Sequence, residues 1–162
     1  MKLFFRKYGE GPAIFILHGL YGSSDNWVSI AKAISSRFTV YLPDLRNHGN
    51  SPHSDIHDYD SMSNDIIELA GNLGIDRYFL AGHSMGGKTA ISVAIKCPGS
   101  ILGLVVADIS PITDPVSAEA AKSEHIHLLQ SLTETDLSSA KRRQDIEIRL
   151  SGKINDQSTR SL

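Results

Sequence analysis

Short, unbroken apolar runs alternate along this chain with stretches of helical periodicity, and this alternation limits the possible folds more than any other feature. Each run is too short for a buried helix and is rich in Ile, Val, Phe or Tyr, so we expect strands that are covered on both faces. The expected strands span residues 13–17, 38–42, 78–81 and 101–107. Residues 3–8, which a Gly-Glu-Gly-Pro turn follows, are expected to add an edge strand.

The segments between these runs have the spacing of amphipathic helices. A Ser-Ser-Asp sequence precedes the first segment, Gly74 ends the second, and Pro98 stops the third. The expected helices cover about residues 27–34, 62–73 and 84–97. Crossovers between parallel strands are right-handed, so this order predicts an α/β fold with one doubly wound, mostly parallel sheet.

The character of the chain changes after the last apolar run. Pro111 and Pro115 interrupt it, and two helical stretches follow at about residues 117–132 and 136–150, with no strand between them. Two consecutive helices after a strand suggest a partial helical cap over the carboxyl edge of the sheet. The predicted organisation is a core at residues 1–112, a partial cap at 113–150 and a polar tail at 151–162.

Composition narrows the class of protein. The chain has 162 residues, and its 16 basic and 18 acidic residues leave a formal charge of −2, which gives no electrostatic reason to expect nucleic acid or an anionic membrane as partner. The start of the chain does not have the pattern of a signal peptide, and no segment has the length of a membrane span. Cys97 is the one cysteine, so no internal disulfide forms and a reducing cytoplasm is expected.

The motif that carries chemistry is Gly-His-Ser-Met-Gly-Gly at residues 82–87, which joins the strand at 78–81 to a helix. This is G-x-S-x-G in its required context of strand, sharp turn and helix. A strained backbone at the apex would lift the Ser84 hydroxyl clear of the sheet, and Gly82 and Gly86 would avoid a collision there. The hydroxyl would then lie at a helix N-terminus, which favours developing negative charge. A tight turn that merely contains a serine is the alternative.

A second motif, His18-Gly19, directly follows the first central strand. An acyl-transfer site needs two donors for the oxyanion of the tetrahedral intermediate. The backbone N–H groups of Met85 and Leu20 are the expected pair. His18 and His83 belong to these two motifs, where we expect their backbones to matter more than their imidazoles.

Four motifs in this order resemble the α/β-hydrolase superfamily. They are H-G-L-Y-G at residues 18–22, D-L-R-N-H-G-N-S-P-H at 44–53, G-H-S-M-G-G-K at 82–88 and A-D-I-S-P at 107–111. The chain is more closely similar to the small esterases typified by bacterial YbfF and their mitochondrial abhydrolase relatives. The second motif is the most specific, because the wider superfamily does not share it in that form.

This resemblance implies a Ser–Asp–His triad and hydrolysis of carboxylic esters through an acyl-enzyme, with no metal or organic cofactor. The nucleophile would be Ser84 and the acid Asp108, which ends a strand at the same edge of the sheet. A turn cap at Ser110-Pro111 is the alternative role for Asp108. The substrate would be a small-molecule ester or thioester, and amides are not distinguished from these.

The resemblance also implies a histidine on a loop after the last strand, whereas the last histidine here is His127. We therefore expect the chain to lack the last strands of the fold, to be inactive or impaired, and to self-associate through the open edge at residues 101–107. If another histidine acts as the general base, His125 or His127 is the best candidate among those present. His53 and His57 fit solvated loop residues better than a metal site. A non-catalytic binding or interaction protein with the same truncated fold is the competing hypothesis.

Overall fold

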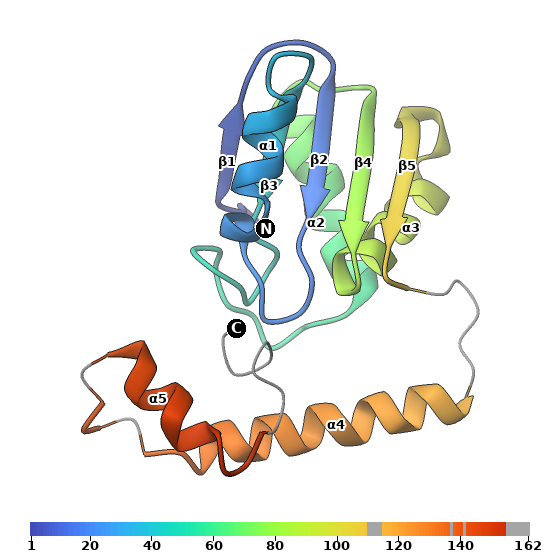
Figure 1. Ribbon diagram of the computed structural model, residues 1–162. Coiled ribbons are helices and arrows are strands. Elements are labelled where there is room, and N and C mark those ends of the chain that lie inside the picture. Colours follow the sequence, from blue (N-terminus) through green and yellow to red (C-terminus); the bar gives the residue numbers. More distant parts are fainter. Residues whose placement is uncertain (110–114, 137, 141, 155–162) are drawn as a thin grey trace. The chain divides into compact units, whose positions relative to one another are not determined.

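The computed structural model describes residues 1–109, 115–136, 138–140 and 142–154. Its centre is a mixed sheet of five strands in the order β1-β3-β2-β4-β5 (Figure 1). β1 runs antiparallel to β3, and the other neighbours are parallel. The predicted α/β architecture and the predicted edge strand are therefore confirmed. The strands are β1 (Phe5–Tyr8), β2 (Ala13–Leu17), β3 (Thr39–Pro43), β4 (Tyr78–His83) and β5 (Ile101–Ala107).

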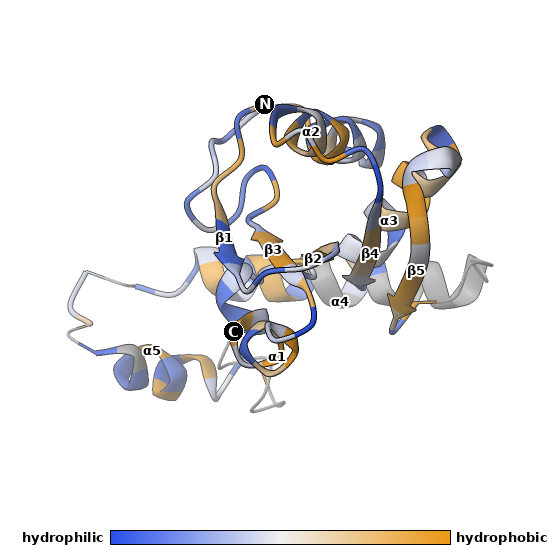
Figure 2. Ribbon diagram, turned by 90° about the horizontal axis from the view of Figure 1, so that it is seen from above, coloured by the Kyte–Doolittle hydropathy of each residue, from blue (hydrophilic) through white to orange (hydrophobic). Residues whose placement is uncertain are grey.

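Helices cover both faces of this sheet. Seen from above, α1 lies on one side of the strands and α2 and α3 lie on the other (Figure 2). Trp27, which was expected in the first α-helix, lies in a short 3-10 turn that Ser23 caps. The helical elements of this unit are η1 (Ser24–Trp27), α1 (Val28–Ile34), α2 (Tyr59–Asn72), α3 (Met85–Lys96) and η2 (Pro98–Ser100).

The core is divided by the sheet into two clusters, because successive side chains of a strand point to opposite faces. Phe15 and Leu17 of β2 pack with the side chains of α2 and α3. Ile16 of the same strand packs on the opposite face with Ala31 of α1. The apolar runs of β2 and β3 are continuous for this reason, because side chains on both faces of these two strands are buried.

The strand register brings three loops together at one edge of the sheet. Leu17 at the end of β2 pairs with Gly82 of β4, and Gly82 pairs with Val106 of β5. His83 pairs with Ala107, the last residue of β5. The segments that follow these strands therefore emerge side by side at the carboxyl edge, where ligands bind in open α/β sheets.

Residues 110–162 form a compact unit of their own, separate from Met1–Ile109. The unit contains α4 (Pro115–Thr133) and α5 (Arg143–Leu150), and its role as a cap stays a prediction. The second helix begins later than expected, because the Asp136 carboxylate accepts the backbone N–H of Ser138 and holds a turn there. Among the described residues, no helix has the length and apolarity needed to cross a bilayer.

Candidate active site

Ser84 stands at the apex of a sharp turn between β4 and α3. Its backbone angles, φ 50° and ψ −115°, lie in a region that a residue with a side chain rarely adopts. A Cβ on Gly82 would lie 2.3 Å from the carbonyl oxygen of Gly86, and one on Gly86 would lie 2.5 Å from the carbonyl oxygen of His18. Both flanking glycines are thus required by close backbone approach, as the motif predicted.

The elbow is anchored on both sides. The Ser84 N–H donates to the carbonyl of Ala107 at the end of β5 (3.0 Å), and the Ser84 carbonyl accepts from Lys88 in the first turn of α3 (3.1 Å). Since α3 begins at Met85, the N–H groups of Met85, Gly86 and Gly87 precede the first helical hydrogen bond and have no acceptor inside the helix. The half-buried Ser84 side chain therefore lies beside backbone donors and the positive end of a helix dipole.

Backbone strain gathers at the same edge of the sheet. In the described part of the chain, four non-glycine residues have positive φ, between 50° and 67°, and each follows the end of a different parallel strand. Strained backbone of this kind clusters at functional sites, where the surrounding structure holds it in place. The four residues are Tyr21 after β2, Asn47 after β3, Ser84 after β4 and Asp108 after β5.

The loop after β2 lies directly against the elbow. A Cβ on Gly19 would lie 3.5 Å from the Cβ of Ser84 and 2.8 Å from Nδ1 of His83. A side chain at position 19 would force the imidazole of His83 to move, so the His18-Gly19 motif and the Gly-His-Ser motif lie in direct contact. Leu20, which was expected to supply a donor, follows in the same loop.

The imidazole of His18 has a structural role that sequence reasoning missed. Its side chain is 1% exposed, its Nε2 accepts the backbone N–H of Leu45 (3.0 Å), and its Nδ1 lies 2.8 Å from the carbonyl oxygen of Gly19. Burial lowers the pKa of His18. The expectation that its backbone matters more than its imidazole is therefore corrected, because the ring ties two loops together.

Asp108 lies one residue beyond β5, next to the carbonyl that receives the Ser84 N–H. Its side chain is 81% exposed, and its Oδ2 lies 3.2 Å from Nε2 of His83. The imidazole of His83 therefore contacts the candidate acid, a pairing that the sequence did not reveal. The role of Asp108 as the acid that orients a catalytic histidine stays a prediction.

The loop after β3 carries the most specific sequence motif and is built around Asp44. This carboxylate is fully buried and accepts the backbone N–H groups of Ser24 (2.6 Å) and Asn50 (2.8 Å). Burial raises the pKa of Asp44, but these donors outweigh it and hold the pKa below its usual value. A Cβ on Gly49 would lie 2.2 Å from the carboxylate, so the loop closes tightly around it.

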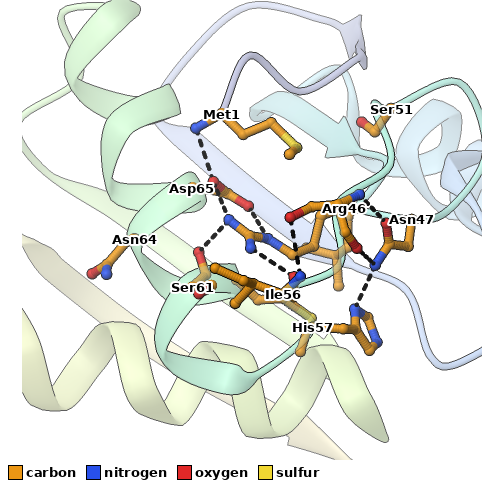
Figure 3. Close-up of polar contacts among 12 residues, drawn as sticks. Met1, Arg46, Asn47, Ser51, Ile56, His57, Ser61, Asn64 and Asp65 are labelled. Carbon is orange, nitrogen blue, oxygen red and sulfur yellow. Dashed lines mark hydrogen bonds and ion pairs between the residues drawn. The ribbon is translucent and has the colours of Figure 1, made fainter.

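An ion pair between Arg46 and Asp65 fastens this loop to α2 (Figure 3). Arg46 donates through Nε to Oδ2 (2.7 Å) and through Nη2 to Oδ1 (3.0 Å) of Asp65. Nη1 of Arg46 donates to the carbonyl of Ile56 (2.9 Å). Hydrogen bonding to Asp65 raises the pKa of Arg46 further. Residues 46 and 65 are far apart in sequence, so spacing gave no sign of this pair.

Asn47 closes the outer part of the same loop through a reciprocal pair of hydrogen bonds. Its Oδ1 accepts the N–H of Ser54 (2.7 Å), and its Nδ2 donates to the carbonyl of Ser54 (3.0 Å). The Nδ2 also lies 3.3 Å from Nδ1 of His57 (Figure 3). These bonds hold the positive φ of Asn47, a residue type that tolerates this conformation.

The rings of His18, His48 and His57 lie in succession next to the candidate site. The His48 ring lies 5.1 Å from that of His18 and 5.7 Å from that of His57. Nδ1 of His48 donates to the carbonyl of Arg46, and His53 is exposed.

No group of His, Cys, Asp and Glu among the described residues has the arrangement of a metal site. Of the two histidines considered as a substitute base, His127 is exposed on α4, and the side chain of His125 lies outside the described residues.

Comparisons with known proteins agree with this geometry. A family model described as "alpha/beta hydrolase fold" matches residues 12–148. The sn-1-specific diacylglycerol lipase ABHD11 of Mus musculus is 50% identical over 103 residues, which is 62% of this chain and 34% of the relative. A solved marine microorganism esterase is 43% identical with a TM-score of 0.91, covering 99% of this chain and 61% of that one. A thermophilic esterase from Thermogutta terrifontis is 26% identical with a TM-score of 0.70, covering 82% of this chain and 48% of that one. The chain thus spans about a third of the curated relative and less than two thirds of either solved esterase.

Proposed function

Because this chain belongs to the α/β-hydrolase family, we propose that it hydrolyses short-chain carboxylic esters through an acyl-enzyme at Ser84. The observation that carries the proposal is the strained Ser84 elbow, which is held against the Gly19 loop at the carboxyl edge of the sheet. The relatives support the substrate class, since they are named as a lipase and as esterases. A serine at this position forms an acyl ester, whereas the aspartate of dehalogenating or epoxide-opening relatives would form an alkyl ester.

In the proposed reaction, the Ser84 oxygen attacks the carbonyl carbon of the ester. The hydroxyl proton passes to the imidazole of the triad histidine that the family resemblance implies. The alcohol then leaves with that proton, and water releases the acid from the acyl-enzyme. Asp108 orients the imidazole, while the N–H groups of Leu20 and Met85 stabilise the oxyanion. One such donor contributes roughly 10²–10³-fold to kcat. No imidazole in the described residues hydrogen-bonds to Ser84, so we expect turnover by this chain to be slow.

The proposal extends to the substrate, the cellular compartment and the oligomeric state. The reaction needs side chains and backbone donors but no metal or organic cofactor, and its reactants are water and a small-molecule ester or thioester. The free Cys97 thiol fits a reducing cytoplasm. β5 borders the sheet of the described strands and exposes apolar side chains, so we propose that a second copy of the chain pairs with it. These side chains are Leu102, Leu104 and Val105.

Two measurements on the full chain test the catalytic role of Ser84. Hydrolysis of p-nitrophenyl butyrate is expected to fall to the rate in buffer in Ser84→Ala and to stay unchanged in Ser29→Ala, which alters an exposed serine of α1. A fluorophosphonate probe, which loses fluoride when an activated serine attacks it, is expected to modify Ser84. Equal hydrolysis by the chain and by Ser84→Ala, together with no adduct at Ser84, would contradict the proposal and favour the non-catalytic hypothesis.

A further inference from the structure

We propose that the His18 imidazole is a positioning residue that holds the Gly19–Leu20 peptide so that the Leu20 N–H faces the substrate oxyanion. This inference rests on the proposed function and adds a residue to its machinery. It assigns the ring a specific task, which is to fix the orientation of one peptide plane through a proton on one named nitrogen.

The carbonyl of Gly19 accepts two hydrogen bonds, one from Nδ1 of His18 (2.8 Å) and one from the N–H of Gly22 (3.1 Å). The C=O of Gly19 and the N–H of Leu20 belong to the same planar trans peptide, so they point in opposite directions. Two bonds that fix the carbonyl on one side therefore also fix the N–H on the other.

A backbone donor fixes the tautomer of His18. The backbone N–H of Leu45 can only donate, and it lies 3.0 Å from Nε2. Nε2 must therefore be unprotonated, which leaves the proton of the neutral ring on Nδ1, where it bonds to Gly19. The single buried ring thus uses both nitrogens and sets the direction of both bonds.

The neighbours of Leu45 hold the backbone N–H that donates to His18. Leu45 lies between Asp44, whose carboxylate is bound by two backbone N–H groups, and Arg46, which is paired with Asp65. Both neighbours of Leu45 are buried and anchored, so its N–H is a fixed point. The loop after β3 therefore supports the oxyanion loop through His18.

The charge state of the ring agrees with this assignment. Burial lowers the pKa of His18, and the neighbouring His48 lowers it as well, whereas the Gly19 carbonyl and the Asp44 carboxylate favour the charged form. Protonation would place an Nε2–H against the Leu45 N–H and break that bond. Activity that depends on the bond is therefore expected to persist to a lower pH than an ordinary histidine would allow.

Two variants separate positioning from packing. In His18→Asn, the side-chain NH₂ lies near the place of Nδ1 and still reaches the Gly19 carbonyl. In His18→Gln, the amide oxygen lies near the place of Nε2 and accepts from Leu45, but the donor to Gly19 is lost. We expect kcat for p-nitrophenyl butyrate to fall about 10²-fold in His18→Gln, with KM nearly unchanged, and by much less in His18→Asn. Loss of activity in step with Tm in both variants would show a merely structural role and overturn the inference.

NMR provides a readout that does not need turnover. Imidazole ¹⁵N spectra are expected to show His18 as the neutral Nδ1–H tautomer at neutral pH, and an Nε2–H tautomer or a charged ring would overturn the inference. Phenylboronic acid, which forms a tetrahedral adduct with an active serine, is expected to shift the Leu20 amide in the unmodified chain and in His18→Asn but not in His18→Gln. The Met85 amide is the control and should shift in all three. An equal Leu20 shift in His18→Gln would contradict positioning, whereas failure of the acid to bind the unmodified chain would count against the proposed function and leave the tautomer to decide the inference.

Discussion

The pair between Arg46 and Asp65 allows a sharp test of how the loop after β3 is held. Asp65 of α2 accepts two charged hydrogen bonds from Arg46, at 2.7 and 3.0 Å, and the side chains are 3% and 9% exposed. In Asp65→Asn one oxygen remains to accept, but the guanidinium keeps its charge in a buried place. Removal of one partner from such a buried pair costs about 3–5 kcal/mol.

An exposed pair on the same helix is the matched control. Asp60 of α2 contacts Lys96 at 2.7 Å, with side chains 74% and 28% exposed. Water already solvates this pair, so Asp60→Asn should cost less than about 1 kcal/mol. The two substitutions thus make the same chemical change in the same helix and differ in the burial of the charges. Each aspartate has one further partner, the N-terminal ammonium of Met1 for Asp65 and the amide of Asn64 for Asp60.

Urea unfolding measures the difference, followed through the fluorescence of Trp27, the only tryptophan. Trp27 lies in the compact unit of residues 1–109, so its signal reports the unit that contains both pairs. The double change Arg46→Met and Asp65→Leu should be less destabilised than the sum of its single changes, because neither member of the pair is left as a buried unpaired charge, and the Met1 ammonium keeps Glu68 as a partner. A loss below 1 kcal/mol in Asp65→Asn, equal to that in Asp60→Asn, would refute this account of the loop.

Two further predictions concern the elbow and the sheet edge. Gly86→Ala should lower the free energy of unfolding by roughly 1–3 kcal/mol, because its Cβ would lie 2.5 Å from the His18 carbonyl oxygen. Gly71→Ala on α2 is the control and should be neutral or stabilising, because a Cβ there would have no heavy atom within 4 Å; equal thermal unfolding of the two variants would contradict the argument. Val105→Lys on β5 should reduce self-association in sedimentation velocity, whereas Ile95→Lys on α3 should not, because Ile95 is at least as exposed but does not belong to the edge strand. Unchanged sedimentation of Val105→Lys would contradict pairing through β5.

The strands and the elbow could be predicted because their signals are local. β2 and β5 have the predicted bounds, since each is a short apolar run that ends directly before the residues of the candidate site. The glycines around Ser84 have a local cause as well, because the collisions they avoid involve the turn itself and the neighbouring strand end. The family could be recognised from the order of these short motifs.

The polar scaffold could not be predicted, because its partners are far apart in sequence. Asp44 binds Ser24, and Arg46 binds Asp65, across 20 and 19 positions, and no periodicity marks either pair. The tautomer of His18 depends on a backbone donor 27 positions away. A signal did exist, since the motif at residues 44–53 is the most specific in the chain. The residue types alone did not reveal which partners the side chains of this motif would bind.

The distribution of strain explains why this polar scaffold lies where it does. Each non-glycine residue in such a conformation costs on the order of 1–3 kcal/mol, and the four described ones follow four strands at one edge. The apolar core packs the strands from both faces, but it does not constrain the loops beyond their ends. A charge-assisted hydrogen bond contributes roughly 1.5–3 kcal/mol, which is the size needed to hold one strained residue. Buried polar groups at the loops, Asp44, Arg46 and His18 among them, therefore maintain the geometry that the core cannot, and their loss should relax the site before it unfolds the sheet.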